Sequence, residues 1–424
     1  MSELALTGGA PVFDKEHRWP RWPQASRADE ARVLQVVRSG AWGIGCPVTR
    51  EFADRFARSI GVRHALPVST GTAALELTIK ALGIGPGDEV IVPAYTFIAT
   101  ATCALQMGAT VVFADIDPET LEIDPAQVAR LITPRTRAII PVHFGGNPCD
   151  MAALLKLAKG RKIAVIEDAA HAHGMIYRGR PGGAIGRAGC FSFQTTKNMA
   201  SGEGGVLATN DETLFRLAES FHSFGRKPGR PWYEHHSISW NQRMTGLQAA
   251  LLIGQLGRLE SQTRRRLANG NYLNDALSQL PGQRPQRAGD RHPKTRRAYH
   301  LYIWRYGAQE TGVPRSLFLE ALRAEGVPAS GGYLMPLQEH AMFVERRFWH
   351  HQFLGGGPRR KGEPDYARVE TPVAKALCGD AVWLPQSLLL GTRGEMRGVV
   401  DAVAKVIANA EALRCLVKRR KGRR

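Results

Sequence analysis

Three side chains with the chemistry of a cofactor site follow short apolar runs in the middle of the chain. Asp168 closes one run, while Ser192 lies at the end of the next and Lys197 shortly after it. A carboxylate can pair with a pyridine nitrogen, a hydroxyl can bind a phosphate, and a lysine can condense with an aldehyde. Pyridoxal phosphate (PLP) requires all three partners, so the sequence predicts a PLP enzyme.

The surroundings of Lys197 distinguish it from an ordinary surface lysine. It follows the strand-like residues 191–193 and precedes Gly202, Gly204 and Gly205, whose small size lets the backbone approach a ligand closely. In that setting it could hold the cofactor as an internal aldimine and then move a proton as base and acid. Each clue alone also fits a lysine in a surface loop. Together, and in this order along the sequence, the clues favour a cofactor site.

These groups must be positioned by a sheet. From about residue 48 to 210, short β-rich runs alternate with helical patterns, which indicates a parallel sheet with crossover helices. We expect an α/β fold: a large domain with a mostly parallel central sheet and helices on both faces, and a smaller C-terminal α+β domain. The predicted boundaries are 1–285, 286–415 and a basic tail, 416–424, expected to be disordered.

Ligands of such sheets bind outside the carboxyl ends of the strands, which selects further residues. Gly71 and Thr72 open a helix after the first strand, where backbone N–H groups can bind phosphate, although a plain capped helix is the alternative. Tyr95 and Phe97 follow the second strand and offer an aromatic ring to stack on the cofactor. A core aromatic is the competing interpretation.

His171 follows Asp168 closely and could bond the phenolic oxygen of the cofactor. The alternative is a histidine whose hydrogen bonds are made to the protein itself. A metal site shared with His173 is not favoured, because no further acid or cysteine ligand follows at suitable spacing. We therefore predict no metal.

Composition narrows the class of protein. The chain has 424 residues, six scattered cysteines and a formal charge of +19. No apolar run approaches the roughly 20 residues that span a bilayer, and the cysteines suit reduced thiols in the cytoplasm. The basic residues are dispersed and no nucleic-acid-binding motif accompanies them. A cytoplasmic enzyme without a membrane or nucleic-acid partner is the expectation.

Several motifs together resemble the DegT/DnrJ/EryC1 family of PLP-dependent sugar and aminocyclitol aminotransferases. The likeness rests on residues 69–75, 93–100, 167–174, 191–205 and 241–245, in that order. The resemblance implies the PLP fold-type I architecture of aspartate aminotransferase. It also implies that Lys197 is the Schiff-base lysine and Asp168 the partner of the ring nitrogen.

The same resemblance assigns the remaining cofactor contacts. Phe97 would stack on the ring, with Tyr95 as the alternative, and His171 would lie near the phenolic oxygen. Gly71, Thr72 and Ser192 would hold the phosphate. Asn241 resembles the residue that reaches the phosphate of the neighbouring subunit, which implies a homodimer with shared active sites.

By the same resemblance, the enzyme would take an amino group from glutamine or glutamate, form pyridoxamine phosphate, and aminate a keto-cyclitol or keto-sugar of antibiotic biosynthesis. An aromatising PLP lyase of the aminohydroxybenzoate kind is the alternative, followed by a regulatory or nucleic-acid-binding protein on the same fold. The candidates for substrate contacts are Tyr95, His143, His235, His236 and Tyr333. A solvated loop is the alternative for the two adjacent histidines.

Overall fold

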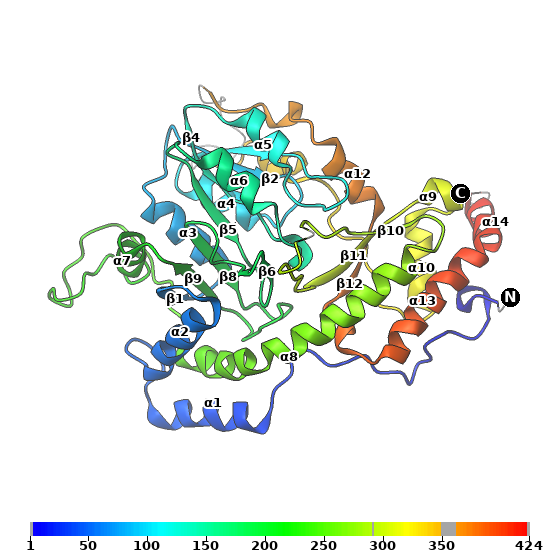
Figure 1. The fold of residues 1–424 in the computed structure, drawn as a ribbon, viewed down its shortest axis with the longest axis horizontal. Helices are drawn as coiled ribbons and strands as arrows, with labels where there is room; N and C mark the ends of the chain where they lie inside the picture. Colours follow the sequence, from blue (N-terminus) through cyan, green and yellow to red (C-terminus); the bar gives the residue numbers. More distant parts are fainter. Residues whose placement is uncertain (1–2, 291, 349–361, 422–424) are drawn as a thin grey trace.

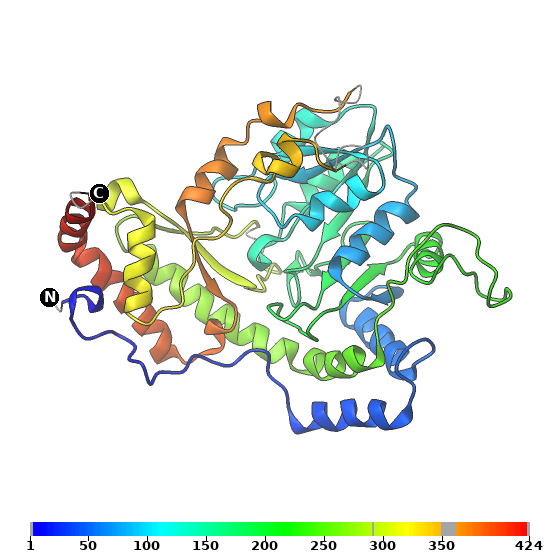
Figure 2. The ribbon, with the colours of Figure 1, turned by 180° about the vertical axis from the view of Figure 1, so that it is seen from behind.

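The structure is a computed structural model that describes residues 3–290, 292–348 and 362–421. Two sheets lie side by side, and one long helix runs past both of them (Figure 1). The view from behind shows the same arrangement, with the two termini close together beside the smaller sheet (Figure 2).

The larger sheet has seven strands in the order β1-β9-β8-β5-β4-β2-β3. All neighbours from β8 to β3 are parallel, and β9 runs antiparallel to both β8 and β1. The strands are β1 (His64–Val68), β2 (Glu89–Pro93), β3 (Thr110–Ala114), β4 (Thr136–Ile139), β5 (Ala164–Asp168), β8 (Ala188–Ser192) and β9 (Gly205–Thr209). The predicted mostly parallel central sheet is confirmed.

Helices cover both faces of this sheet. Because strand side chains alternate between faces, Val90 and Val92 of β2 pack into one buried cluster and Ile91 into another. The first cluster contains residues of α3 (Gly71–Ala81), α4 (Ala99–Gln106) and α7 (Glu212–Phe221). The second contains residues of α2 (Pro47–Ile60), α5 (Pro125–Leu131), α6 (Met151–Ala158) and α8 (Gly246–Leu277).

The smaller sheet is antiparallel, in the order β10-β11-β12. Its strands are β10 (Gln283–Pro285), β11 (Leu301–Tyr306) and β12 (Ala381–Pro385), and a separate hairpin pairs β6 (Ile176–Tyr177) with β7 (Arg180–Pro181). The other helices are α1 (Arg27–Ser39), α9 (Ala308–Thr311), α10 (Arg315–Ala324), α11 (Ala341–Val344), α12 (Pro372–Asp380), α13 (Arg393–Ala408) and α14 (Ala410–Lys421). Short 3-10 helices lie at Ala5–Thr7, Phe144–Gly146, Leu337–Glu339, Tyr366–Arg368 and Leu388–Leu390.

Helix α8 ties the two sheets together. Its 32 residues span about 48 Å, and a capping box between Thr245 and Gln248 fixes its start. Near its beginning Leu252 packs under the large sheet, whereas Leu273 and Leu277 near its end join the core of the small sheet around Trp304. A single rigid element therefore sets the small sheet against the carboxyl ends of the large one.

Segments near both ends of the chain pack into the core of the small sheet. Leu4 packs in the same core as the small sheet, and β10 begins before the predicted boundary at 286. The tail predicted to be disordered from residue 416 continues helix α14 to Lys421, because the buried Leu413 anchors a segment rich in helix-forming residues. Residues 422–424 lie outside the described part, and the division into domains stays a prediction.

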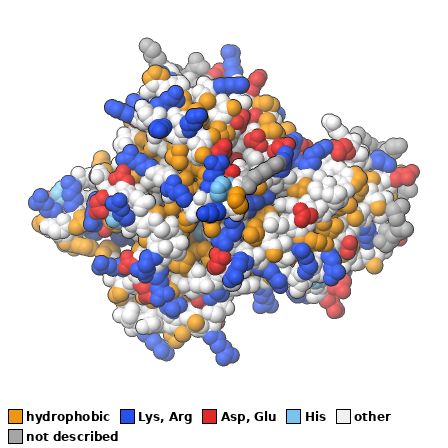
Figure 3. Space-filling model, in the orientation of Figure 1, with side chains coloured by type: hydrophobic (Ala, Val, Ile, Leu, Met, Phe, Trp, Pro, Cys, Tyr) orange, Lys and Arg blue, Asp and Glu red, His pale blue; other side chains and the backbone are white. Residues whose placement is uncertain are grey.

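None of the helices in the described ranges combines the length and the apolar character that crossing a membrane requires. Lysines and arginines are spread over the face in Figure 3 and do not gather in one stripe. A concentrated basic footprint, which nucleic-acid binding usually needs, is therefore not present on that face.

Candidate active site

A cavity of about 530 Å³ opens at the carboxyl ends of the parallel strands. Residues that follow β1, β2, β5 and β8 line it, as the rule for open α/β sheets predicts. The lining includes Thr70, Gly71, Thr72, Thr96, Phe97, Asp168, His171, Ser192, Lys197 and Glu203. The fold thus gathers the candidate cofactor residues in one place, with the exception of Asn241.

Lys197 is placed where a reactive amine is needed. Burial lowers the pKa of its ammonium group to about 8, and the nearby Asp168 carboxylate opposes this shift. A lysine with a pKa near 8 is partly neutral close to physiological pH, and only the neutral amine attacks an aldehyde. Its backbone N–H donates to the Gln194 carbonyl at 2.8 Å, which fixes the loop that carries it.

Asp168 is buried, with an exposed fraction of 6%, at the end of β5. Burial raises the pKa of its carboxyl group, while hydrogen bonds and the Lys197 charge act in the opposite direction. Its Oδ1 accepts the Ala170 N–H at 3.2 Å, and its Oδ2 accepts the Thr100 hydroxyl at 2.8 Å. The carboxylate is thus held rigidly while it lines the cavity.

A narrow cradle lies at the start of helix α3. The N–H groups of Gly71 and Thr72 belong to the first turn, where no carbonyl of the same helix faces them. A Cβ atom on Gly71 would come within 2.7 Å of the Ser192 Cβ, so only glycine lets the two segments meet. Unpaired N–H groups, a helix dipole and a serine hydroxyl at one point fit a phosphate.

His171 presents one ring nitrogen to the cavity. Its Nδ1 accepts the Gly145 N–H at 3.2 Å, so Nε2 carries the proton and can donate. Burial lowers the pKa of His171 well below its usual value, and the neighbouring His300 adds to the effect. The imidazole is therefore a neutral donor, which suits a phenolate oxygen.

The two aromatic candidates have different environments. Phe97 is 59% exposed and lines the cavity, whereas Tyr95 is 1% exposed. The Tyr95 ring packs edge-on against Tyr333, at 5.1 Å between centroids, and against Phe144 at 5.2 Å. The geometry favours Phe97 as the ring that stacks on a cofactor, whereas Tyr95 and Tyr333 pack against each other and are not part of the cavity lining.

His143 lies away from the cavity lining. It is fully buried, its Nδ1 accepts the Cys149 N–H, and its Nε2 donates to Glu167 at 2.9 Å. The same Glu167 carboxylate accepts backbone N–H groups of Gly183, Ile185 and Gly186. Both ring nitrogens of His143 are thus engaged in holding a loop, which leaves none for a substrate.

His235 and His236 lie on an arm, residues 224–240, that extends from the body beside α7 (Figure 1). His235 bonds the Phe224 carbonyl at 2.9 Å, and His236 pairs with Glu234 at 3.2 Å. Neither histidine lines the cavity of its own chain. The base of the arm is held by Lys80, whose ammonium lies 4.6 Å from the centre of the Trp240 ring.

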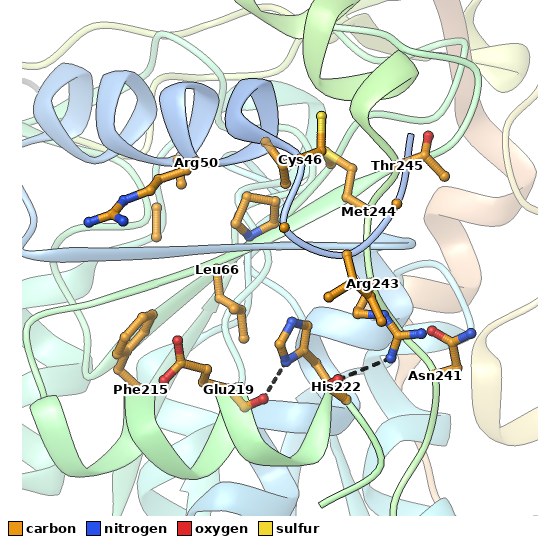
Figure 4. A pocket seen from close by; sticks show the side chains of 18 of the residues that line it. Cys46, Arg50, Leu66, Phe215, Glu219, His222, Asn241, Arg243, Met244 and Thr245 are labelled. Carbon is orange, nitrogen blue, oxygen red and sulfur yellow. Dashed lines mark hydrogen bonds between the residues drawn. The ribbon is translucent and has the colours of Figure 1, made fainter. Parts of the chain in front are cut away.

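Asn241 is exposed and lines a second, larger cavity of about 850 Å³ outside edge strand β1. In Figure 4, His222 bonds the Glu219 carbonyl, and Asn241 lies beside Arg243. Arginines and acids line this cavity, but it holds no lysine or strand-end acid of the kind found around Lys197. The smaller cavity therefore has the reactive groups, and the larger one is a surface feature beside it.

Sequence reasoning missed two residues of the site. Thr100, which follows β2, donates a hydrogen bond to Asp168 at the end of β5. His300 packs on His171 from the segment that leads into β11. The only available signal for Thr100 was its position one turn after Thr96 in a strand-end motif. His300 had no signal, because its approach depends on how the small sheet docks.

Comparisons with known proteins agree with this geometry. Residues 23–354 match the model of the DegT/DnrJ/EryC1/StrS aminotransferase family. A protein of Streptoalloteichus tenebrarius, provisionally named L-glutamine:3-amino-2,3-dideoxy-scyllo-inosose aminotransferase, is 40% identical, over 97% of this chain and 100% of its own length. The L-glutamine:2-deoxy-scyllo-inosose aminotransferase of the same organism is 36% identical, over 97% of this chain and 99% of its own.

The structural comparison gives the same fold. The crystal structure of 3-amino-5-hydroxybenzoic acid synthase superposes with a TM-score of 0.82 at 32% identity, over 92% of this chain and 99% of that one. The expected PLP fold-type I architecture is confirmed, and the chain belongs to the DegT/DnrJ/EryC1/StrS aminotransferase family.

Proposed function

We propose that this aminotransferase uses PLP to move an amino group from glutamine or glutamate to a keto carbon of a cyclitol or sugar. One observation carries the proposal: a single cavity holds a lysine with a lowered pKa, a buried carboxylate and a helix-start cradle. These match the aldehyde, the ring nitrogen and the phosphate of one cofactor.

Each residue has a distinct task in this proposal. Lys197 Nζ holds the cofactor and then moves the proton between substrate carbon and cofactor. Asp168 keeps the ring nitrogen protonated, and the neutral His171 donates from Nε2 to the phenolic oxygen. Phe97 covers one face of the ring. When bound, PLP supplies the electron sink that stabilises a carbanion next to nitrogen.

The names of the relatives support a cyclitol acceptor and glutamine as donor. Both Streptoalloteichus proteins are named for transfer from L-glutamine to a scyllo-inosose derivative. A second candidate, a PLP lyase that forms an aromatic product, is supported by the structural likeness to 3-amino-5-hydroxybenzoic acid synthase. The higher identity and the nearly complete coverage of the named aminotransferases favour transfer.

A homodimer with shared active sites completes the proposal. Asn241 is exposed outside its own cofactor cavity, and Phe97 at the cavity rim is left 59% exposed. Tyr233 and Ile238 on the arm are 83% and 92% exposed, so the arm carries side chains that a partner could bury. We infer that a second subunit covers these surfaces, with Asn241 reaching its phosphate and the arm histidines its acceptor.

A cytoplasmic location is part of the same proposal. All six cysteines are free, and five of them are buried. Buried, unpaired thiols suit a reducing compartment.

The spectrum of the purified protein tests the proposed function. Wild-type protein should absorb in the violet, and L-glutamine should bleach this band. Lys197→Ala should lack any borohydride-stable link to the cofactor, while Lys159→Ala, at an exposed lysine, should retain it. A band that neither glutamine nor glutamate changes, with release of an aromatic product from a keto-cyclitol, would establish the lyase instead.

A further inference from the structure

The Asp168 carboxylate is bonded by a threonine from another strand end. Thr100 Oγ1 donates to Asp168 Oδ2 at 2.8 Å, and both side chains are buried, with exposed fractions of 0% and 6%. Thr100 lies on α4, which follows β2, whereas Asp168 closes β5 two strands away in the sheet. Within the described residues, Thr100 is the one side chain that gives this carboxylate a hydrogen bond.

A second threonine sets the direction of the bond. Thr96 Oγ1 lies 3.0 Å from Thr100 Oγ1, and it is 2% exposed. An ionised carboxylate can only accept, so Thr100 must give its single proton to Asp168. Thr96 then donates to Thr100, and the three groups form a chain of hydrogen bonds that ends on the carboxylate.

This chain of hydrogen bonds offsets part of the free energy that burial costs the ionised Asp168 carboxylate. Burial raises the pKa of Asp168, and the Thr100 bond heads the interactions that lower it, followed by the Ala170 N–H and the charge of Lys197. A hydrogen bond to a charged group is stronger than one between neutral groups, most of all in a dry site. The bond also fixes Oδ2, so the orientation of the carboxylate in the cavity is set.

We infer that Thr100, oriented by Thr96, is a positioning residue that holds the Asp168 carboxylate ionised and aimed at the ring nitrogen of the cofactor. The inference rests on the proposed function, because it gives Thr100 a task only if a pyridine ring binds in the cavity. It predicts that Thr100 strengthens the binding of the ring nitrogen and leaves the binding of the rest of the cofactor unchanged.

The test compares two ligands on cofactor-free protein. One is PLP, and the other is its carbocyclic analogue, in which a C–H group replaces the ring nitrogen. The ratio of their dissociation constants, measured by equilibrium dialysis, reports the contact with the ring nitrogen alone. General damage to the fold or to the cradle changes both constants and cancels in the ratio.

Wild-type protein should prefer PLP, and Thr100→Val should reduce this preference about tenfold or more, because an isosteric side chain removes the donor. Thr100→Ser restores the hydroxyl and should keep the preference. Thr102→Val makes the same change on the same helix, at a residue without a bond to Asp168, and should also keep it. Thr96→Val should lower the preference in the same direction by a smaller factor.

An unchanged preference in Thr100→Val overturns the inference. Should that variant fail to fold, an unchanged preference in Thr96→Val has the same meaning. Wild-type protein that does not bind PLP at all would instead refute the proposed function, so the two failures are distinguishable.

Discussion

The imidazole of His300 lies against that of His171, with 4.0 Å between ring centroids and an interplanar angle of 31°. His300 Nδ1 donates to Asn198 Oδ1 at 3.2 Å, next to Lys197, and its backbone N–H donates to the Gly145 carbonyl. The same Gly145 bonds His171. The segment before β11 of the small sheet therefore fixes the ring that faces the cavity.

Replacement of His300 should loosen His171. We expect His300→Ala to weaken PLP binding about three- to tenfold, because the His171 ring loses its packing partner and its orientation. Fluorescence titration of cofactor-free protein measures the change. His292→Ala, at an exposed histidine of the same segment, is the matched control. Equal affinity in wild type and His300→Ala would show that His171 is held by Gly145 alone.

The contact of Gly71 with Ser192 should be sensitive to a single methyl group. Gly71→Ala places a Cβ within 2.7 Å of the Ser192 Cβ and should cost about 1–3 kcal/mol in the free energy of unfolding. The same change should cost less in a Ser192→Gly background, because the clashing atom is gone. Urea denaturation of the four proteins measures this coupling. Gly257→Ala, in open space on α8, should stabilise by up to about 1 kcal/mol.

The lowered pKa of Lys197 predicts a pH dependence of stability. Its pKa is about 8 in the folded protein and 10.5 in the unfolded chain, because burial disfavours the ammonium form. Between these values the unfolded state binds more protons, so stability contributed by this group rises with pH. Relative to Lys197→Met, cofactor-free wild type should gain about 2–3 kcal/mol from pH 8 to 10.5. Parallel curves for the two proteins would contradict the burial of this amine.

Glu167 should be a structural residue, in contrast to its neighbour Asp168. Its carboxylate accepts three backbone N–H groups and the His143 ring, so Glu167→Gln replaces an acceptor with a donor against them. We expect a loss of about 2–4 kcal/mol in the free energy of unfolding. Glu51→Gln, at an exposed ion pair with Arg55, should change it by less than about 0.5 kcal/mol. Denaturant melts of both variants provide the comparison.

Shared active sites predict complementation between two inactive variants. If Asn241 of one subunit serves the site of the other, a dimer of Lys197→Ala and Asn241→Ala chains contains one site with both native residues. Mixing the variants under exchange conditions should restore about a quarter of wild-type activity, because half of the dimers are hybrids with one intact site. Activity that stays at the level of the separate variants would place Asn241 outside the neighbouring site.

The sequence alone determined those residues of the site whose position depends on the end of one strand only. Lys197, Asp168, Ser192 and Gly71 could be predicted because a strand's length, its apolar pattern and the residue after it are local properties. The order of these strands then brings their carboxyl ends to one edge of a parallel sheet. The mostly parallel sheet was predictable for the same reason.

Only the tertiary structure decided which groups meet. Thr100 reaches Asp168 across an intervening strand, and His300 reaches His171 through the docking of the small sheet on α8. The fold also turns His143 towards Glu167 and carries His235 away from the cavity. Such contacts depend on sheet order and on the angle of a long helix, which no local pattern of residues records.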